Sequence, residues 1–297
     1  MEAFLEAAQL LPPDLRHGAE ALPQLIQRRG EELRLRAGRL PTVVVGRDEL
    51  PLPDCKAVTV RDLERTVELA TRASAHAALE RLRQGWFTVQ GGHRLGICGS
   101  LAVEGGKIAG LRRLSSLNIR VARAVPGCGD GLIRRLLEGD RPVSTLLLAP
   151  PGGGKTTLLR DLLRRFSDGV DCPPLRVGLA DERGEVAALW EGIPQMEVGG
   201  RTDVVEGCPK AQGLMLLLRG MNPQLLACDE ITEPTDCRAL EQCANCGVLL
   251  LATAHGSSVE DLRTRPLYRR LLEQKLFRRV VLLDRNSPAP WRVEALC

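Results

Sequence analysis

Residues 146–160 have the sequence LLLAPPGGGKTTLLR, in which an apolar run, three glycines, Lys-Thr-Thr and a helical apolar repeat follow one another. This order predicts a strand, a phosphate-binding loop and a helix. Glycines have no Cβ, so backbone N–H groups can close around phosphate oxygens, and the helix N-terminus directs partial positive charge at the same oxygens. Ala149 stands where such a loop usually has its first glycine. A glycine-rich turn that arose by chance is the alternative, and the flanking strand and helix disfavour it.

The polar residues of this loop each have an expected contact with a nucleoside triphosphate. Lys155 supplies a mobile positive charge for the β- and γ-phosphates, and Thr156 supplies a hydroxyl ligand for Mg²⁺. We therefore predict ATP and Mg²⁺ as the bound species. The loop residues expected to bind the nucleotide are Pro151, Gly152, Gly153, Gly154, Lys155, Thr156 and Thr157.

Length and composition restrict the class of protein. The chain has 297 residues, enough for one large domain or two smaller ones, and its hydrophobic share of 44% supports a packed core. A net charge of +4 and an aromatic content of 3% are both low for a protein that binds nucleic acid, so we expect no nucleic-acid partner.

The cysteines and the N-terminus indicate the compartment. Ten cysteines occur without the basic segment that opens a secretory signal, which favours a reducing, cytoplasmic environment. No apolar run approaches the ~18 residues that a membrane-spanning helix needs. We therefore expect no direct membrane span, and membrane contact only through a partner.

After the phosphate loop, apolar strands alternate with helices. This alternation predicts an α/β domain whose parallel sheet is covered on both faces. Helices are expected to begin near Pro209 and Pro234, and Ser257 with Glu260 form a candidate capping box for a third. The expected strands cover residues 146–149, 175–180, 224–228, 248–252 and 277–283.

The first part of the chain has a different pattern, which predicts a smaller α+β domain. Thr59 and Asp62 form a capping box for a helix that continues to Gly85. Residues 86–90 and 94–98 flank Gly91-Gly92 and predict a hairpin. The glycine-rich residues 126–131 are interpreted as a flexible junction. The expected domains are therefore an α+β N-terminal domain over residues 1–126 and a P-loop ATPase domain over residues 127–297.

Two acidic residues, Asp229 and Glu230, follow the third expected strand of the second domain. In open parallel sheets the ligand lies at the carboxyl ends of the strands. Asp229 is expected to hold Mg²⁺, directly or through water, and Glu230 to polarise the water that attacks the γ-phosphate. A kinase needs no second acid for that purpose, so the pair favours hydrolysis. A strand that happens to end in two acids is the alternative.

Polar residues also follow the neighbouring strands. His255 follows the fourth strand, where it could sense the γ-phosphate or serve only as a structural hydrogen-bonding residue. Asp181, Glu182 and Glu185 follow the second strand and could act in the same site or form a solvated turn.

Cys243 and Cys246 have the spacing of a zinc or redox pair. Structural zinc takes four ligands, usually from two such pairs, and this chain offers one pair. Small residues packed at a helix end are the preferred interpretation.

Several segments together resemble one family. They are PPGGGKTTLLRDLLR, RTDVVEGCPKAQGLMLLLRGMNP and ATAHG in the second half, and ELRLRAGRLP, GWFTVQGGHRLGICG and LNIRVAR in the first. In combination they resemble stage III sporulation protein AA over nearly the whole chain. That family is similar to the ring-forming motor ATPases of type II and type IV secretion and of type IV pili.

The resemblance implies a RecA-like C-terminal domain, with the nucleotide between it and the N-terminal domain. Asp181 and Glu182 match the acidic box of such motors, and Thr253 and His255 match the histidine box. Arginines of the N-terminal domain act at the nucleotide in these motors.

Arg120 in LNIRVAR is the best candidate for that arginine, with Arg113 behind it. The C-terminal domain offers no obvious arginine for the phosphates, because Arg160 and Arg164 are expected to lie along the helix. The residues expected to act in catalysis are Lys155, Glu230, His255 and Arg120.

The resemblance further implies an ATP-hydrolysing motor that powers a transport or assembly channel between mother cell and forespore during endospore formation. The motor would be a homo-hexamer in the mother-cell cytoplasm, docked at the outer forespore membrane on membrane proteins of the channel complex. The alternative is a nucleotide-gated scaffold that binds ATP, assembles with these partners and hardly hydrolyses it. A nucleic-acid-dependent ATPase of RecA type is disfavoured by the low charge and aromatic content.

Overall fold

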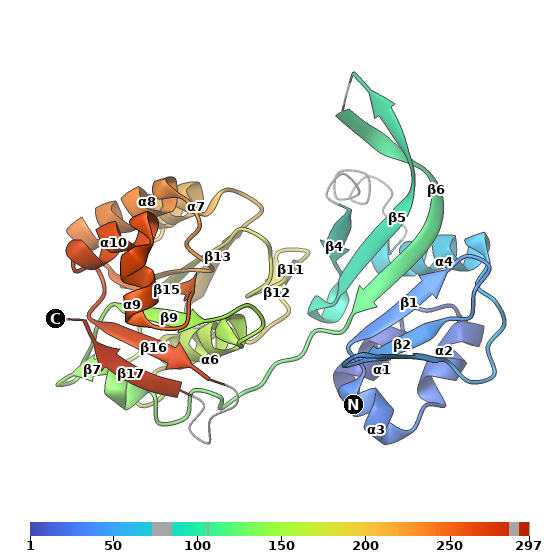
Figure 1. The fold of residues 1–297 in the computed structure, drawn as a ribbon, viewed down its shortest axis with the longest axis horizontal. Helices are drawn as coiled ribbons and strands as arrows, with labels where there is room; N and C mark the ends of the chain where they lie inside the picture. The colour runs from blue at the N-terminus through green and yellow to red at the C-terminus, as the bar shows by residue number, and fades with distance from the viewer. Residues whose placement is uncertain (73–84, 106, 285–290, 297) are drawn as a thin grey trace. The chain divides into compact units, whose positions relative to one another are not determined.

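A computed structural model describes residues 1–72, 85–105, 107–284 and 291–296 (Figure 1). The chain forms two compact units. The N-terminal unit comprises Met1–Arg123 and Ala188–Gln195, and the C-terminal unit comprises Ala124–Ala187 and Met196–Cys297. The return of Ala188–Gln195 to the first unit was not predicted from the sequence. This segment carries a two-stranded hairpin, β11 (Leu189–Trp190) and β12 (Ile193–Pro194).

The N-terminal unit is the predicted α+β structure. Its six-stranded antiparallel sheet has the order β3-β2-β1-β6-β5-β4. Large apolar side chains such as Phe4, Leu33 and Ile119 form its buried core. The elements are α1 (Glu2–Ala8), α2 (Pro13–Glu20), α3 (Gln24–Arg29), α4 (Val60–Thr71), β1 (Glu32–Arg36), β2 (Thr42–Val45), β3 (Asp48–Pro51), β4 (Trp86–Thr88), β5 (Arg94–Glu104) and β6 (Lys107–Arg120).

The predicted capping box at the start of α4 is confirmed. The Thr59 hydroxyl accepts from the backbone N–H of Asp62 at 3.2 Å, and the Asp62 carboxylate accepts from the N–H of Thr59 at 2.8 Å. Two orphan donors of the first helical turn are thereby satisfied. The predicted continuation of this helix falls on residues 73–84, which lie outside the described residues.

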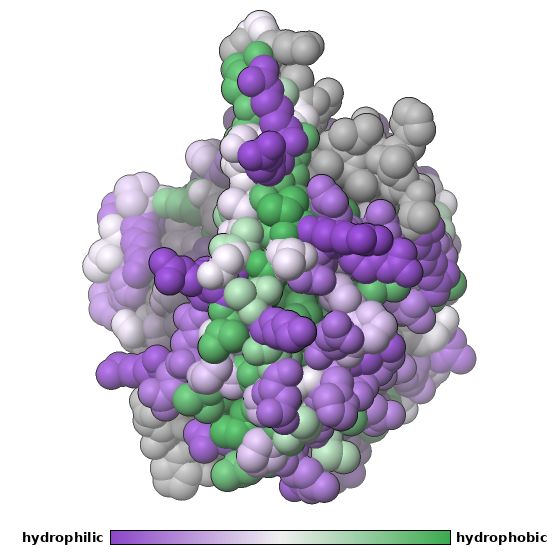
Figure 2. All heavy atoms as spheres, turned by 90° about the vertical axis from the view of Figure 1, so that its right-hand side faces the viewer, coloured by the Kyte–Doolittle hydropathy of each residue, from purple (hydrophilic) through white to green (hydrophobic). Residues whose placement is uncertain are grey.

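The predicted hairpin is confirmed by the antiparallel pairing of β4 with β5, whereas the longer ribbon of β5 and β6 was not predicted. β5 pairs with β4 over Arg94–Gly96, and β6 pairs with β1 over Ser116–Arg120, so the far end of each strand pairs only with the other. Leu101 and Val103 near this end are 46% and 59% exposed. Figure 2 shows this end in space-filling form, with hydrophobic residues beside hydrophilic ones.

The C-terminal unit is the predicted α/β domain. Its seven-stranded sheet has the order β13-β10-β14-β15-β9-β16-β17, parallel except at the antiparallel edge strand β17. Every residue of β9, β10 and β14 is buried, as expected for strands covered on both faces. The strands are β9 (Thr145–Ala149), β10 (Val177–Asp181), β13 (Thr202–Glu206), β14 (Leu225–Cys228), β15 (Leu249–His255), β16 (Arg279–Leu283) and β17 (Trp291–Ala295).

Helices cover both faces of this sheet (Figure 1). α7, α8 and α10 pack on one face against a common apolar core, and α6 packs on the other. The helices are α6 (Lys155–Asp168), α7 (Lys210–Gly220), α8 (Pro234–Asn245), α9 (Val259–Thr264) and α10 (Pro266–Glu273). A short helix η2 (Ile133–Leu136) and a hairpin of β7 (Leu137–Glu138) and β8 (Arg141–Pro142) precede β9.

The expected starts of α7 and α8 are confirmed, and the expected cap of α9 is wrong by one residue. Pro209 is the N-cap of α7, and Pro234 is the first residue of α8. At α9 the cap is Ser258, whose hydroxyl accepts from the N–H of Asp261 at 3.1 Å. β13 and β17 were not predicted, because neither has a continuous apolar run.

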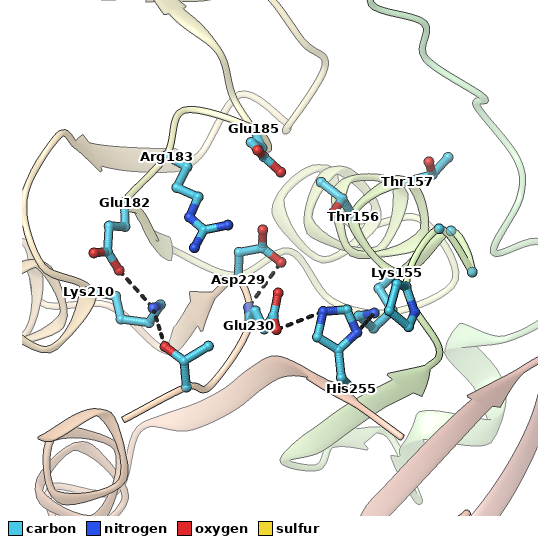
Figure 3. A pocket seen from close by; sticks show the side chains of 15 residues that line it. Lys155, Thr156, Thr157, Glu182, Arg183, Glu185, Lys210, Asp229, Glu230 and His255 are labelled. Atoms are coloured by element: carbon cyan, nitrogen blue, oxygen red, sulfur yellow. Dashed lines mark hydrogen bonds and ion pairs between the residues drawn. The ribbon is translucent and has the colours of Figure 1, made fainter. Parts of the chain in front are cut away.

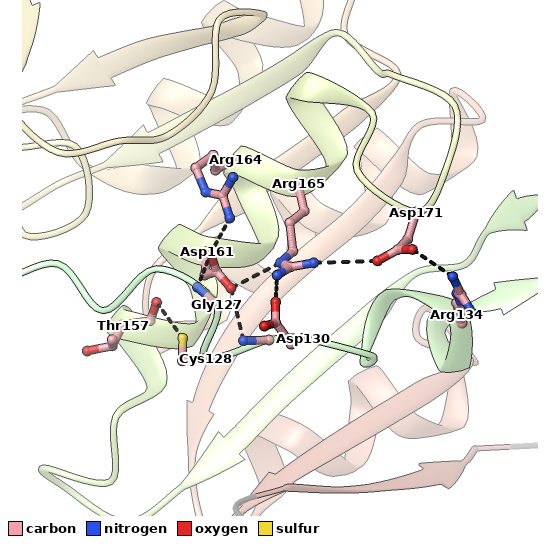
Figure 4. A network of polar contacts seen from close by, with 10 residues as sticks. Gly127, Cys128, Asp130, Arg134, Thr157, Asp161, Arg164, Arg165 and Asp171 are labelled. Carbon is pink, nitrogen blue, oxygen red and sulfur yellow. Dashed lines mark hydrogen bonds and ion pairs between the residues drawn. The ribbon is translucent and has the colours of Figure 1, made fainter.

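The predicted flexible junction is also wrong, because part of it is held to α6 (Figure 4). The N–H groups of Gly127 and Gly129 donate to the two carboxylate oxygens of Asp161 at 3.1 and 2.9 Å. The Cys128 thiol donates to the carbonyl of Thr157 at 3.6 Å. A segment held at three consecutive residues is anchored to the C-terminal unit.

Asp161 is nearly fully buried, and two arginines of the same helix compensate its charge. Arg164 and Arg165 bind its carboxylate at 2.8 and 3.1 Å, and Arg165 also pairs with Asp130 and with Asp171. The two N–H contacts of Asp161 therefore fix the chain before β9 against α6, whereas Arg164 and Arg165 belong to the helix itself.

We predict that Asp161→Ala destabilises the C-terminal unit by about 3–5 kcal/mol, because it leaves the N–H groups of Gly127 and Gly129 without their acceptor and removes one of the carboxylates that compensate Arg165. The measurement is urea denaturation followed by the fluorescence of Trp291, in a chain whose Trp86 and Trp190 are replaced by phenylalanine. Glu260→Ala is the matched control, since that side chain is 77% exposed and its ion pair contributes little. Equal losses in the two variants would contradict the prediction.

Candidate functional site

A pocket lies at the carboxyl edge of the C-terminal sheet, where β14, β15 and the loop after β9 end (Figure 3). Parallel pairing brings these ends together, as expected for an open α/β sheet. The pocket is lined by Pro151, Gly152, Gly153, Gly154, Lys155, Thr156, Thr157, Glu182, Arg183, Glu185, Lys210, Asp229, Glu230, Thr232 and His255.

The loop between β9 and α6 has the backbone of a phosphate cradle. Gly152 and Gly154 have φ values of +71° and +91°, in the left-handed region that favours glycine, and Gly154 caps α6. A Cβ on Gly153 would lie 2.6 Å from the Cβ of Ala149. Ala149 is therefore accommodated because residue 153 has no side chain.

Lys155 is the first residue of α6 and lies in the interior of the pocket. Its ammonium donates to the carbonyls of Ala149 and Pro150 at 3.0 and 3.3 Å, and its Nζ lies 2.7 Å from Nδ1 of His255. Burial lowers the pKa of Lys155, although Glu230 and Asp229 act in the opposite direction. An anion bound here would stabilise the charged form of Lys155.

Lys155, His255 and Glu230 form a continuous chain of polar contacts. A lysine ammonium can only donate, so Nδ1 of His255 accepts and the ring hydrogen is on Nε2. That Nε2 lies 2.7 Å from Oε1 of Glu230. His255 thus contacts Lys155 with one ring nitrogen and Glu230 with the other. From the sequence, His255 and Glu230 had only been placed after separate strands.

Asp229 is held by the strand beside it. The Thr253 hydroxyl donates to Oδ1 of Asp229 at 3.0 Å and accepts from the N–H of Glu230 at 2.9 Å. Burial raises the pKa of Asp229, so a cation beside it would favour its charged form.

The pocket fits a divalent cation as well as phosphate. Oδ2 of Asp229 and the hydroxyl of Thr156 accept or donate no hydrogen bond within the described part of the chain. Both are hard oxygen ligands, the type that Mg²⁺ prefers. Thr156 and Asp229 are the residues that would hold this ion.

The three acidic residues at the end of β10 and in the loop after it do not all reach the pocket. Asp181 is buried beneath the loop and accepts from the N–H groups of Glu185, Val186 and Ala187 at 2.8–2.9 Å, and burial raises its pKa. It is absent from the residues that line the pocket, whereas Glu182 and Glu185 line it. Arg160 of α6 donates to the carbonyls of Val186 and Glu185, so this arginine supports the same loop.

Lys210 was missed in the sequence analysis. Its ammonium pairs with Glu182 at 2.7 Å and with Asp236 at 3.6 Å, and it reaches Thr232 at 3.4 Å. Burial acts to lower the pKa of Lys210, but the two carboxylates outweigh it and the pKa is raised. Lys210 directly follows Pro209, where a helix was expected to begin, and this position could have indicated a side chain near the pocket.

Arg183 also lines the pocket, which corrects the expectation that the C-terminal domain brings no arginine to the phosphates. It comes from the loop after β10, and its side chain points towards Asp229 in Figure 3. Arg183 directly follows Asp181 and Glu182 in the sequence, where only the acidic residues were singled out.

Arg120 belongs to the N-terminal unit. It is the last residue of β6, its side chain is 60% exposed, and its Nε lies 3.8 Å from a carboxylate oxygen of Glu32. Arg113 lies earlier on the same strand, opposite Ser100. The role of Arg120 at the nucleotide stays a prediction.

Cys243 and Cys246 differ in their surroundings. Cys243 is fully buried in the core on the α8 side of the sheet, which raises its pKa to about 11, whereas Cys246 is exposed at the end of α8. Over the described ranges, no group of three or more His, Cys, Asp or Glu side chains is arranged to hold a metal ion.

Comparison with known proteins gives the family. The sequence model of the family described as "Sporulation stage III, protein AA" matches residues 8–296. The chain belongs to this family. It is 37% identical over 281 residues to the stage III sporulation protein AA of Bacillus subtilis, covering 94% of this chain and 91% of that protein. An uncharacterised protein, ycf45, of Porphyra purpurea is 36% identical over 50% of this chain and 26% of its own length.

Solved structures share the fold. The pilus retraction motor PilT, solved with bound ADP, has a TM-score of 0.59 at 15% identity, covering 88% of this chain and 77% of PilT. The ATPase DotB of Legionella pneumophila has a TM-score of 0.55 at 16% identity, covering 85% and 72%. The chain thus has the fold of secretion and pilus ATPases, a RecA-like domain preceded by an α+β domain. None of its described helices is both long and apolar enough to cross a membrane.

We predict that purified protein contains less than one zinc per chain, because a buried thiol at Cys243 and an exposed one at Cys246 make an incomplete ligand set. Metal analysis by mass spectrometry measures this, with Cys243→Ser and Cys98→Ser as the test and control variants. Stoichiometric zinc that is lost only in Cys243→Ser would reverse the interpretation.

Proposed function

We propose that this protein hydrolyses ATP with Mg²⁺ and works as a motor for a transport or assembly channel during endospore formation. The observation that carries the hydrolysis is the contact chain from Lys155 through His255 to Glu230, at the edge of a phosphate cradle. A nucleotide-binding scaffold would need the cradle and Lys155, but no carboxylate placed to act on water.

In this proposal Lys155 exchanges its carbonyl partners for the β- and γ-phosphates of ATP. The bound Mg²⁺ would neutralise part of the phosphate charge. Thr156 and Asp229 hold the ion, and Thr253 keeps Asp229 in place through its hydroxyl.

Glu230 orients the attacking water and accepts its proton as the bond from the γ-phosphorus to the leaving oxygen breaks. His255 is a positioning residue for this step. Because it contacts both Lys155 and Glu230, a movement of Lys155 towards phosphate changes the environment of the base. This gives His255 a means to report nucleotide occupancy.

We predict that Glu230→Gln retains ATP binding and loses hydrolysis by on the order of 10²–10⁴-fold, because an amide cannot accept the proton of the water. Lys155→Ala is expected to lose both binding and hydrolysis. The measurements are steady-state phosphate release and binding of a fluorescent ATP analogue.

Glu260→Gln serves as the control, since it makes the same chemical change on an exposed side chain outside the pocket. Wild-type hydrolysis in Glu230→Gln would show that the base is another residue. Undetectable hydrolysis in the wild type, with intact ATP binding, would favour the scaffold.

The proposed motor role requires several copies of the chain, with one copy completing the nucleotide site of the next. We infer a homo-hexamer in which an arginine of a neighbouring chain, Arg120, completes the site when ATP is bound. Support comes from the fold shared with PilT and DotB, from the solvent exposure of Arg120, and from the rule that heterologous contacts can close into rings. Arg183 is the competing candidate, because it already lines the pocket of its own chain.

We predict that Arg120→Ala binds ATP and hydrolyses it at least ~10³-fold more slowly, as expected for loss of an arginine finger. Mixing Arg120→Ala chains with Lys155→Ala chains should restore part of the activity, since an intact Lys155 meets an intact Arg120 wherever an Arg120→Ala chain has a Lys155→Ala chain as the neighbour that supplies the arginine. Phosphate release and particle mass with and without ATP are the measurements.

Arg183→Ala mixed with Lys155→Ala is the matched control. These two residues line one pocket, so no chain in that mixture has a complete set and activity should stay low. A monomer that hydrolyses ATP at the full rate at every concentration would refute the shared site and leave the single-chain site standing.

The cellular role is proposed from family membership and from the name of the Bacillus subtilis relative. The protein would work in the mother-cell cytoplasm and reach the outer forespore membrane through membrane proteins of the channel. Loss of sporulation in Glu230→Gln cells, with the protein present at wild-type level, would tie the role to hydrolysis.

A further inference from the structure

Two adjoining grooves on the C-terminal unit form a second surface, which we call the α7–α8 surface. The first lies between α7 and α8, and the second continues from it to the amino edge of the sheet. Met215 and Arg219 belong to both grooves, so the two are continuous. The first is lined by Ala211, Gln212, Met215, Leu216, Arg219, Thr235, Arg238, Ala239 and Gln242.

This surface has one sign of charge. Arg219 and Arg238 line the first groove, and Arg141, Arg176 and Arg219 line the second. None of the lining residues of either groove is acidic. Elsewhere in the domain most exposed arginines of helices and strands pair with a carboxylate, as Arg270 does with Glu241. These four arginines form no ion pair with any described residue.

The same surface is apolar between its arginines. Leu216 projects from α7 with 60% of its area exposed, the highest value for a leucine after Leu25 among the described residues. Met215 is half-buried beside it, and Ala211 and Ala239 leave the space between the helices open. A helix pair with small residues along its seam and a large apolar side chain at its rim has the form of a groove that receives a third helix.

We propose that the α7–α8 surface binds an acidic amphipathic helix of a protein partner. The apolar face of that helix would pack on Leu216 and Met215, and its carboxylates would pair with Arg219 and Arg238. Nucleic acid is the weaker candidate, since the lining contains no aromatic side chain for base stacking and its most exposed member is a leucine.

The position of this surface leaves the nucleotide pocket open. Gln224 and Leu249, at the amino ends of β14 and β15, border the second groove, whereas Asp229 and His255 at the opposite ends border the pocket. Because the strands are parallel, the second groove and the nucleotide pocket lie at opposite edges of one sheet.

The helices nevertheless connect the two sites. α7 begins at Lys210, which lines the pocket, and reaches Arg219 in its last turn. α8 begins two residues after Thr232 and carries Asp236 in its first turn, and Lys210 contacts both side chains. A helix bound between α7 and α8 therefore contacts the two elements that hold Lys210, and this gives a partner a direct route to influence the site.

The test uses the full chain and a labelled peptide of about five helical turns, with leucines on one face and glutamates beside them. Fluorescence anisotropy measures its binding. We expect Arg219→Glu with Arg238→Glu to weaken binding at least tenfold, and added salt to weaken it in the wild type. Leu216→Asn should also weaken binding without a change in charge, which separates apolar packing from electrostatics.

Arg28→Glu with Arg29→Glu is the matched control, because it makes the same charge change at exposed positions of α3 in the other unit. A lysine-for-glutamate version of the peptide should not bind. Equal weakening by the two double variants would overturn the proposal. So would tighter binding of a single-stranded oligonucleotide at the same residues, or loss of self-association in Arg219→Glu with Arg238→Glu but not in the control, which would assign this surface to a second copy of the chain.

This inference adds a docking surface to the proposed function, and the two can fail separately. Peptide binding is measured without hydrolysis, so Glu230→Gln should bind the peptide as the wild type does. A protein that binds the peptide but releases no phosphate would refute the motor and keep the docking surface.

Discussion

The register of three parallel strands is the constraint on which the site depends. β15 pairs with β9 so that His255 lies opposite Ala149, and with β14 so that Ala252 lies opposite Cys228. Thr253 and Asp229, the next residues on each strand, are thereby brought within hydrogen-bond reach. A slip by one residue would turn every side chain of the slipped strand to the other face of the sheet and separate these contacts. Burial on both faces fixes the register, so the core that stabilises the domain also positions its chemistry.

The two lysines of the pocket, Lys155 and Lys210, differ in how much nearby negative charge the protein provides for them. Lys210 has two carboxylate partners, and its raised pKa reflects that it is well compensated. Lys155 is held by carbonyl oxygens and a histidine, and its lowered pKa reflects the cost of burial. A phosphate group supplies the negative charge that the surroundings of Lys155 lack. The pocket is thus arranged to gain more from an anion at Lys155 than at Lys210.

α6 connects the phosphate loop to two other segments. Its first residue is Lys155, Arg160 holds the loop after β10, and Asp161 holds Gly127 and Gly129 of the preceding segment. Lys155 lies in the first turn of this helix, and Arg160 and Asp161 lie in the second, so one element carries all of these contacts. On the other face of the sheet, α7 and α8 extend from the pocket to the α7–α8 surface.

The sequence by itself determined the phosphate loop, the acidic pair Asp229-Glu230 and the positions of the central strands along the chain, because glycine spacing and apolar periodicity are local signals. It also carried the family resemblance that the comparisons confirm. Only the tertiary structure showed that Lys210 and Arg183 line the pocket, that His255 bridges Lys155 and Glu230, and that Asp161 anchors a glycine-rich segment taken as flexible. Each of these depends on residues far apart in the chain. Their contacts follow from strand register and helix packing, which no local pattern of residues encodes.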